Sequence, residues 1–223
     1  QCLLYPEVAA AVQTVFRSPN ARDGLYITMD VGAGTVDMNA FLRFTGNRNR
    51  HEPTANTSRR LDYYAATVCA LGVQNLNDPH GAVERRQERD LMHDLRQELQ
   101  ALYLRALRYQ PNHGVGEGRR TWDSATSLIF GGGALHRGYR ENFATGLEHA
   151  GIYSPQVHNL PAAQDLTRPK GVDFGRFAVA YGLSYFRPSL DEVRLPNELI
   201  PFYDLYPQAN GQPPIQYGFN WDD

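Results

Sequence analysis

The sequence predicts an α/β fold, and three observations support this prediction. An apolar run over 25–29 leads into a glycine-containing turn and returns as an alternating strand over 36–44, which is the pattern of a β-hairpin. The last third alternates strand and helix, since a strand pattern over 125–130 precedes a helical pattern over 137–150. With 42% hydrophobic and 21% charged residues, the composition is that of a globular protein.

The elements between these segments follow in chain order. Pro6 begins a short helix over 7–16, and the polar stretch 45–60 is expected to contain a third, more exposed strand. Apolar residues at helical spacing predict a helix over 61–73. Leucines that recur every three or four residues predict a long, charged helix over 82–109.

The C-terminal part adds two short elements and a tail. A short strand is predicted near 156–160, and a compact apolar helix is predicted over 174–186. From residue 188 onward the chain contains six prolines, which predict an extended tail that lies on the domain.

Charge and cysteine content exclude several functional classes. The chain carries 22 Lys+Arg against 24 Asp+Glu, so it has no general electrostatic attraction to nucleic acid or anionic lipid. Its apolar runs are far shorter than the roughly 18–20 residues of a spanning helix, which excludes a transmembrane protein. The two cysteines form no C-x-x-C pair, which favours a reducing, cytoplasmic location, and we expect Cys69 to lie in the core.

The sharpest motif is D-V-G-A-G-T-V-D, which begins at Asp30 between the two hairpin strands. Gly32 and Gly34 let backbone N–H groups approach phosphate oxygens, and Thr35 adds a hydroxyl. Asp30 is expected to hold Mg²⁺ through water, and Asp37 brings a second carboxylate to the same place. The alternative interpretation is a plain hairpin turn, in which Gly and Asp are common.

A second glycine motif joins the strand that ends at Phe130 to the following helix. Gly131, Gly132 and Gly133 would let a flat or anionic group lie against the backbone, although such a turn can also be purely architectural. Neither glycine motif has the third glycine of a dinucleotide-binding fingerprint, which disfavours NAD-type cofactors. We expect His136 to cap the helix that follows.

The order of these motifs resembles the second lobe of the actin, hexokinase and seventy-kilodalton heat-shock chaperone superfamily. Pro6–Ala11 is similar to the crossing helix of the chaperones, in which the chain crosses from one lobe to the other. Phe177–Leu183 is similar to the alanine- and glycine-rich closing helix of their second lobe, so the resemblance is nearest the chaperone branch. It implies a ribonuclease H-like lobe over 1–187, with a mixed sheet flanked by helices and a helical insertion over about 61–120, followed by the proline-rich tail over 188–223.

The resemblance implies half of a site for ATP or ADP with Mg²⁺, the other half coming from a missing N-terminal lobe. The hairpin would line the β- and γ-phosphates, Asp30 would face the magnesium shell, and the triple-glycine bend would lie beside ribose and adenine. Charged residues of the long helix, Arg85, Arg86 or Arg89, could reach the adenine. The nucleotide-binding residues implied in this way are Gly32, Ala33, Gly34, Thr35, Asp37, Gly131, Gly132, Gly133 and Ala134.

The catalytic residues implied are Asp30 and, less directly, Glu7. In the chaperones a glutamate precedes the crossing proline, but here that residue is Tyr5 and Glu7 lies on the other side of the proline. The resemblance implies that the parent protein is an ATPase with a client or partner protein, while the isolated chain is not expected to hydrolyse ATP because half of the phosphate cradle is absent. Two alternatives stay open, a non-catalytic protein-interaction scaffold on the same fold and a sugar or acid kinase lobe.

Overall fold

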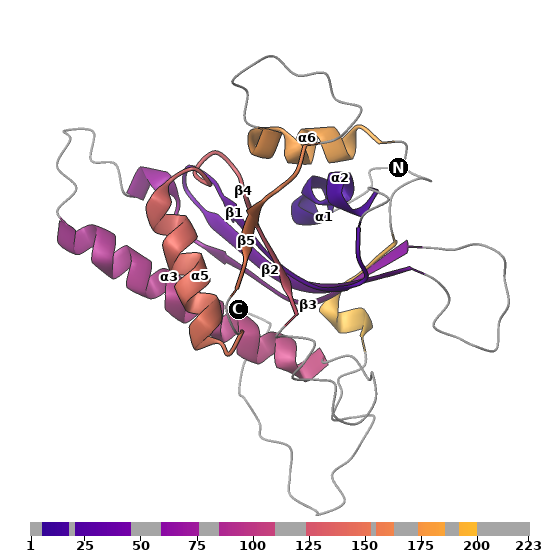
Figure 1. The fold of residues 1–223 in the computed structure, drawn as a ribbon, viewed down its shortest axis with the longest axis horizontal. Helices are drawn as coiled ribbons and strands as arrows, with labels where there is room; N and C mark the ends of the chain where they lie inside the picture. The colour runs from indigo at the N-terminus through magenta and orange to yellow at the C-terminus, as the bar shows by residue number, and fades with distance from the viewer. Residues whose placement is uncertain are drawn as a thin grey trace, which may run out of the picture.

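The computed structural model describes residues 6–17, 21–45, 59–75, 85–109, 124–152, 155–162, 174–185 and 192–199. A six-stranded mixed sheet passes through them in the order β5-β4-β1-β2-β3-β6 (Figure 1). The first three strands form an antiparallel meander, β4 runs parallel to β1, β5 runs parallel to β4, and β6 runs parallel to β3. The strands are β1 (Gly24–Val31), β2 (Val36–Thr45), β3 (Arg59–Cys69), β4 (Thr126–Phe130), β5 (Val157–Asn159) and β6 (Glu192–Arg194).

Helices cover both faces of the sheet (Figure 1). One face carries α1 (Glu7–Ala11), α2 (Gln13–Phe16) and α6 (Ala178–Leu183), and the other carries α3 (Arg85–Ala106) and α5 (Arg137–His149). Short 3₁₀ helices complete the described elements: η1 (Val73–Asn75), η2 (Leu107–Tyr109), η3 (Phe174–Arg176) and η5 (Pro196–Glu198). Among the described helices, none combines the length and the apolar character that a membrane span requires.

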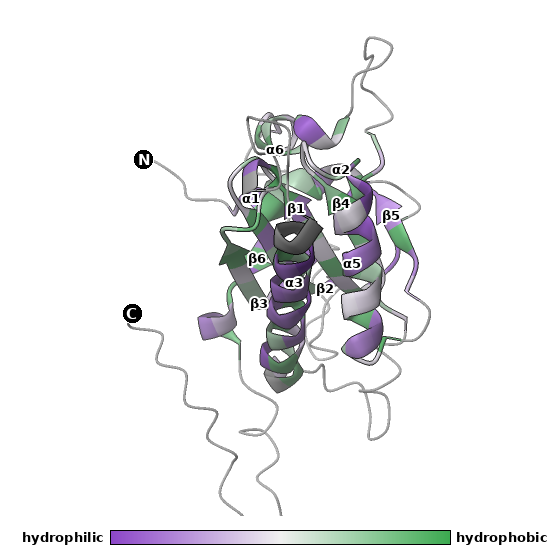
Figure 2. Cartoon of the chain, turned by 90° about the vertical axis from the view of Figure 1, so that its left-hand side faces the viewer, coloured by the Kyte–Doolittle hydropathy of each residue, from purple (hydrophilic) through white to green (hydrophobic). Residues whose placement is uncertain are grey.

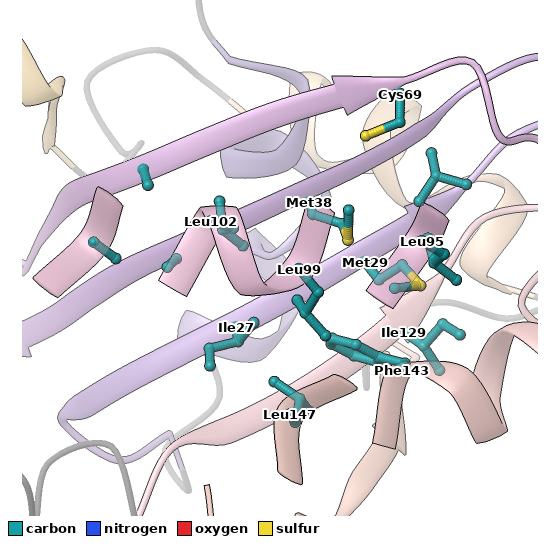
Figure 3. Close-up of a cluster of buried hydrophobic side chains, with 14 of the residues drawn as sticks. Ile27, Met29, Met38, Cys69, Leu95, Leu99, Leu102, Ile129, Phe143 and Leu147 are labelled. Atoms are coloured by element: carbon teal, nitrogen blue, oxygen red, sulfur yellow. The ribbon is translucent and has the colours of Figure 1, made fainter. Parts of the chain in front are cut away.

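Two hydrophobic clusters, one on each face, hold the layers together. In β1 the side chains of Ile27 and Met29 pack under α3 and α5, whereas Tyr26 packs with α1 and α2. Figure 3 shows part of the first cluster, in which leucines of α3 and Phe143 of α5 meet the methionines of the sheet. The outward surfaces of α3 and α5 are largely hydrophilic (Figure 2). Because one cluster covers each face, strand residues are buried on both faces of the sheet.

This mixed sheet flanked by helices is the architecture that the sequence predicts. The hairpin, the long helix and the strand–helix alternation of the last third are confirmed. The first helix is interrupted at Val12, and the apolar helix near the C-terminal end is divided into η3 and α6. His136 caps α5 as expected, because its Nδ1 accepts the N–H of Gly138 at 3.2 Å, and Cys69 is buried.

The helix expected over 61–73 is wrong, because these residues belong mainly to strand β3. Leu61 and Tyr63 face one cluster, whereas Tyr64 and Ala65 face the other, so apolar residues occur at both parities and imitate helical spacing. Pairing with β2 along its length, with a register shift at Ala40/Phe41, decides the conformation. Within the described residues, the helical part of the expected insertion therefore begins at α3.

The proline-rich segment also contributes to the sheet. Strand β6 pairs with Arg60, Leu61 and Asp62 of β3, although the sequence indicated only an extended tail from residue 188. Three residues of parallel pairing give too short a pattern to be recognised in the sequence. Residues 200–223 lie outside the described part of the chain, as do Tyr5 and the stretch 46–58 that was expected to hold most of the third strand.

Candidate functional site

The acidic hairpin places two carboxylates side by side at the end of β1. Asp30 is opposite Asp37 in the antiparallel register, and the N–H of Gly32 donates to the carbonyl of Thr35 at 2.9 Å to close the turn. Side chains alternate across a strand, so Asp30 lies on the same face as Tyr26, which is the face covered by α1. The Thr35 hydroxyl donates to Asp37 Oδ2 at 3.3 Å.

The segment that follows β3 holds the hairpin turn in place. It turns back against the hairpin so closely that a Cβ at Gly72 would lie 2.4 Å from the carbonyl oxygen of Ala33, which only glycine permits. No described group accepts the N–H of Ala33 or Gly34. The turn thus keeps donors available, while its carbonyl oxygens are occupied by three N–H groups: Val73 to Gly32 (3.1 Å), Gln74 to Ala33 (2.8 Å) and Gly72 to Gly34 (3.2 Å).

The triple-glycine bend lies directly against this hairpin. Strand β4 pairs with β1 so that Phe130 is opposite Asp30, and the N–H of Gly133 donates to the carbonyl of Val31 at 2.8 Å. Gly131 has a φ of 89°, and a Cβ there would lie 2.2 Å from Asp30 Oδ1. Only glycine allows the carboxylate this approach. The fold therefore brings together the two glycine motifs that are about a hundred residues apart in the sequence.

The members of the second bend differ in accessibility. Gly132 is exposed, and its N–H has no acceptor among the described residues. Gly133 and Ala134 are buried, and their N–H groups donate within the protein, to Val31 and Gly131 respectively. A ligand that approaches this bend would therefore meet the backbone at Gly132 before it meets the other positions.

Electrostatics at the hairpin favour a cation. Burial, together with the charges of Asp37 and Glu7, raises the pKa of Asp30 from its ordinary value of 3.8 to about 6. Burial also raises the pKa of Asp37, and its hydrogen bond from Thr35 opposes that change. Glu7 is exposed at the first position of α1, and its charge contributes to the raised pKa of Asp30. The carboxylates of Glu7, Asp30 and Asp37 therefore lie near one another at one end of the sheet.

The donor set fits magnesium rather than a fully protein-bound metal. Neither Asp30 nor Asp37 has an ion-pair partner among the described residues, so a divalent cation would relieve their repulsion. The described residues include no group of three or more His, Cys, Asp or Glu side chains placed to ligate a metal. Mg²⁺ commonly keeps several waters and takes one or two carboxylates together with substrate phosphates, which this site can accommodate.

Sequence reasoning did not identify a groove that is lined in part by the first turns of α5, the helix after the second bend. It lies between α3 and α5, has a volume of about 760 Å³ and is adjacent to the His136 cap. A Cβ at Gly138 would lie 3.2 Å from Met92 Cε, so the two helices approach closely at the groove floor. Of the arginines considered for an adenine, Arg89 lines the groove. The remaining lining residues are Asp90, Met92, His93, Arg96, Gly138, Glu141 and Asn142.

A second position that the sequence did not indicate is Arg176, at the end of η3. Its guanidinium lies over Gly132, with Nε 3.3 Å from the position that a Cβ of Gly132 would occupy. The G-R-F triplet before α6 has no recognisable ligand-binding pattern, so only the packing of η3 against the bend could reveal this neighbour.

No protein-family model matches this sequence, and no curated protein matches it. Solved structures do match. A PilM-PilN type IV pilus biogenesis complex is 19% identical, with 81% of this chain and 51% of that chain covered and a TM-score of 0.47. EutJ, an ethanolamine utilization protein from Carboxydothermus hydrogenoformans, is 16% identical over 69% and 47% (TM-score 0.31), and an archaeal actin homolog is 14% identical over 81% and 54% (TM-score 0.39).

These structural neighbours are members of the actin-like ATPase fold. The chain spans about half the length of each of them, as the coverages of 51%, 47% and 54% show. Likeness at this level says nothing about individual site residues.

Proposed function

We propose that this chain is the nucleotide-binding half of an actin-like ATPase and takes ATP or ADP with Mg²⁺. The contact of the two glycine bends supports this proposal most strongly, because a carboxylate with a raised pKa touches a bend whose exposed backbone is glycine. The unengaged N–H groups of Ala33, Gly34 and Gly132 offer donors to an anionic ligand on either side of that carboxylate.

In this proposal the phosphates lie along the hairpin turn and the base extends towards the α3–α5 groove. The unengaged N–H groups of Ala33 and Gly34 would donate to phosphate oxygens, whereas Gly32 and Thr35 would line the phosphates and close the turn through their own hydrogen bond. The groove is lined in part by the first turns of α5, the helix after the second bend, and combines the apolar side chain of Met92 with polar groups, which suits a planar, hydrogen-bonding base.

The chemistry is phosphoryl transfer to water, in which positioning and charge neutralisation do most of the work. Magnesium supplies neutralisation of charge on the β- and γ-phosphates. Asp30 remains largely ionised at neutral pH with a pKa of about 6, so it can hold the waters around that cation. Glu7 presents an exposed carboxylate near Asp30 and is our candidate for orienting the attacking water. The remaining part of the phosphate cradle would come from an N-terminal lobe, so the chain alone would not turn over ATP.

We also propose that the parent protein is nearest to the seventy-kilodalton heat-shock chaperones and acts in the cytoplasm. The crossing-helix and closing-helix motifs support this branch, and they form α1 and α6, which pack against each other. A Cβ at Gly182 would lie 1.8 Å from the carbonyl oxygen of Ala10, so the two helices meet backbone to backbone. Nucleotide-driven closure would move this pair together and transmit the state of the site to a client or partner protein.

The test is isothermal titration calorimetry of the chain with ATP and ADP, with and without magnesium, alone and joined to an N-terminal lobe. We expect binding that requires magnesium, that tightens when the second lobe is present, and that is lost in Asp30→Ala. Asp94→Ala, which changes an exposed carboxylate of α3 outside the groove lining, is the matched control. Absence of magnesium-dependent binding in both forms would contradict the proposed function.

A second candidate function is a non-catalytic scaffold that binds a protein partner through the same fold. Tyr5, which stands where the chaperones have a glutamate, favours it. This alternative predicts that Asp30→Ala leaves partner binding and the cellular role unchanged, whereas an ATPase role predicts that both are lost. Complementation of a deletion strain with the Asp30→Ala gene would separate the two.

A further inference from the structure

Arg176 lies against the only exposed glycine of the triple-glycine bend. Its Nε, Nη2 and Cζ atoms are 3.3, 3.6 and 3.9 Å from the position that a Cβ of Gly132 would occupy. The guanidinium therefore lies over the backbone where no side chain separates them. A Cβ at Gly132 would require the guanidinium to shift by a few tenths of an ångström, so glycine fits this approach best.

The guanidinium of Arg176 has no acceptor in the described part of the chain. It forms neither a hydrogen bond nor an ion pair there, and the residue is exposed. Other arginines near the site differ in this respect: Arg96 Nε donates to the carbonyl of Met92 in its own helix, and Arg137 pairs with Glu141. Arg176 thus brings an unused positive charge and several N–H donors to the bend.

The surroundings of this charge indicate what it can bind. Gly131 brings the bend against the Asp30 carboxylate, and the next residue, Gly132, brings it against the Arg176 guanidinium. One peptide unit therefore separates a position suited to a cation from a position suited to an anion. The unengaged N–H of Gly132 adds a donor beside the guanidinium. A ligand that carries an anionic group next to a divalent cation matches both positions.

We propose that Arg176 binds a phosphate of the nucleotide, an inference that rests on the proposed function and adds a specificity-determining residue to it. The guanidinium donates to a phosphate oxygen of a nucleotide that lies across Gly132, in the forked geometry that suits arginine and phosphate. The residue therefore makes the site select nucleotides over nucleosides. It contributes to affinity only when the ligand carries phosphate.

The experiment is titration calorimetry of the same chain with Mg-ATP, Mg-ADP and adenosine, for the wild type, Arg176→Ala and Arg176→Lys. We expect Arg176→Ala to weaken binding of Mg-ATP and Mg-ADP by about 10- to 100-fold, the range for one charge-assisted hydrogen bond. Adenosine binding should not change, and Arg176→Lys should restore part of the affinity. Arg22→Ala removes an equal charge before β1, at the end of that strand remote from Asp30, and should have no effect.

The outcomes separate this inference from the proposed function. If the wild-type chain binds no Mg-ATP, the proposed function fails and the role of Arg176 fails with it. If the wild type binds Mg-ATP and Arg176→Ala binds it equally well or more tightly, the guanidinium only covers the bend and this inference alone is overturned. Equal weakening of Mg-ATP and adenosine would show a structural role and would also overturn it. Thermal melts of each variant confirm folding.

Discussion

Asp30 is a carboxyl group that the fold does not stabilise in its ionised form. Its pKa rises from 3.8 to about 6 through burial and two neighbouring carboxylates, so the folded state holds the proton more tightly than the unfolded state. The free energy of unfolding therefore falls as pH rises between about 4 and 6, and the full cost is present above that window. Residues that carry such a cost are frequently those that bind or react.

The first prediction follows from that sign. Replacing Asp30 with the isosteric Asn removes the charge, so Asp30→Asn should raise the free energy of unfolding at pH 8 by up to about 3 kcal/mol and leave it unchanged near pH 4. The same variant should lose magnesium-dependent nucleotide binding. Urea denaturation at both pH values measures the first effect, with Asp94→Asn on the exposed side of α3 as control. Equal stability of Asp30→Asn and the wild type at pH 8 would show that the carboxylate carries no such cost.

At the scale of elements, the packing of α1 on α6 depends on a glycine. Gly182 lies within a helix, where replacement by alanine ordinarily stabilises by about 0.5–1 kcal/mol. Here a Cβ would lie 1.8 Å from the carbonyl oxygen of Ala10, and that backbone atom cannot move without shifting α1. Tertiary packing therefore reverses the effect that helix propensity alone predicts.

The second prediction is that Gly182→Ala destabilises the protein by about 3 kcal/mol, at the upper end of the range for overpacking. Gly146→Ala in α5 is the matched control. Its new Cβ would meet the terminal Cδ2 of Leu99 at 2.6 Å, and that methyl can rotate away. Urea denaturation of both variants measures the difference. A cost for Gly182→Ala no larger than for Gly146→Ala would disprove the close contact of α1 with α6.

The hairpin and the strand β3 show what local pattern can and cannot predict. The hairpin was predictable because alternation, two glycines and flanking carboxylates are all local. Strand β3 was not, because helices cover both of its faces and remove the alternation that distinguishes a strand. The segment of Gly72 to Gln74 that anchors the hairpin turn carries no motif, and only its position after β3 gives it that role.

At the scale of the whole molecule, β6 joins the proline-rich segment to the sheet. It covers the edge of β3 at Arg60–Asp62, where Leu61 is fully buried and Asp62 is almost so. The domain can be defined to end at residue 187 or after residue 199, and the two definitions lead to different predictions. The first treats the segment as an accessory tail, and the second treats it as the last strand of the domain.

The third prediction is that a chain of residues 1–187 melts at a lower temperature than a chain of residues 1–200. Loss of β6 exposes an edge of β3, and each kcal/mol lost from a domain of this size lowers the melting temperature by roughly 2–4 °C. Calorimetric melts of the two chains at equal concentration provide the measurement. Equal melting temperatures would favour the boundary at 187 and an accessory role for the tail.

The sequence by itself determined the fold class, the acidic hairpin and the glycine bend after β4, since each depends on residues close together in the chain. Tertiary structure decided that Asp30 touches Gly131, that Arg176 lies over Gly132, and that β3 and β6 extend the sheet. The physical reason is that the parallel pairing of β4 with β1 sets the distance between the two bends. That pairing links residues about a hundred positions apart, and no local pattern encodes such a contact.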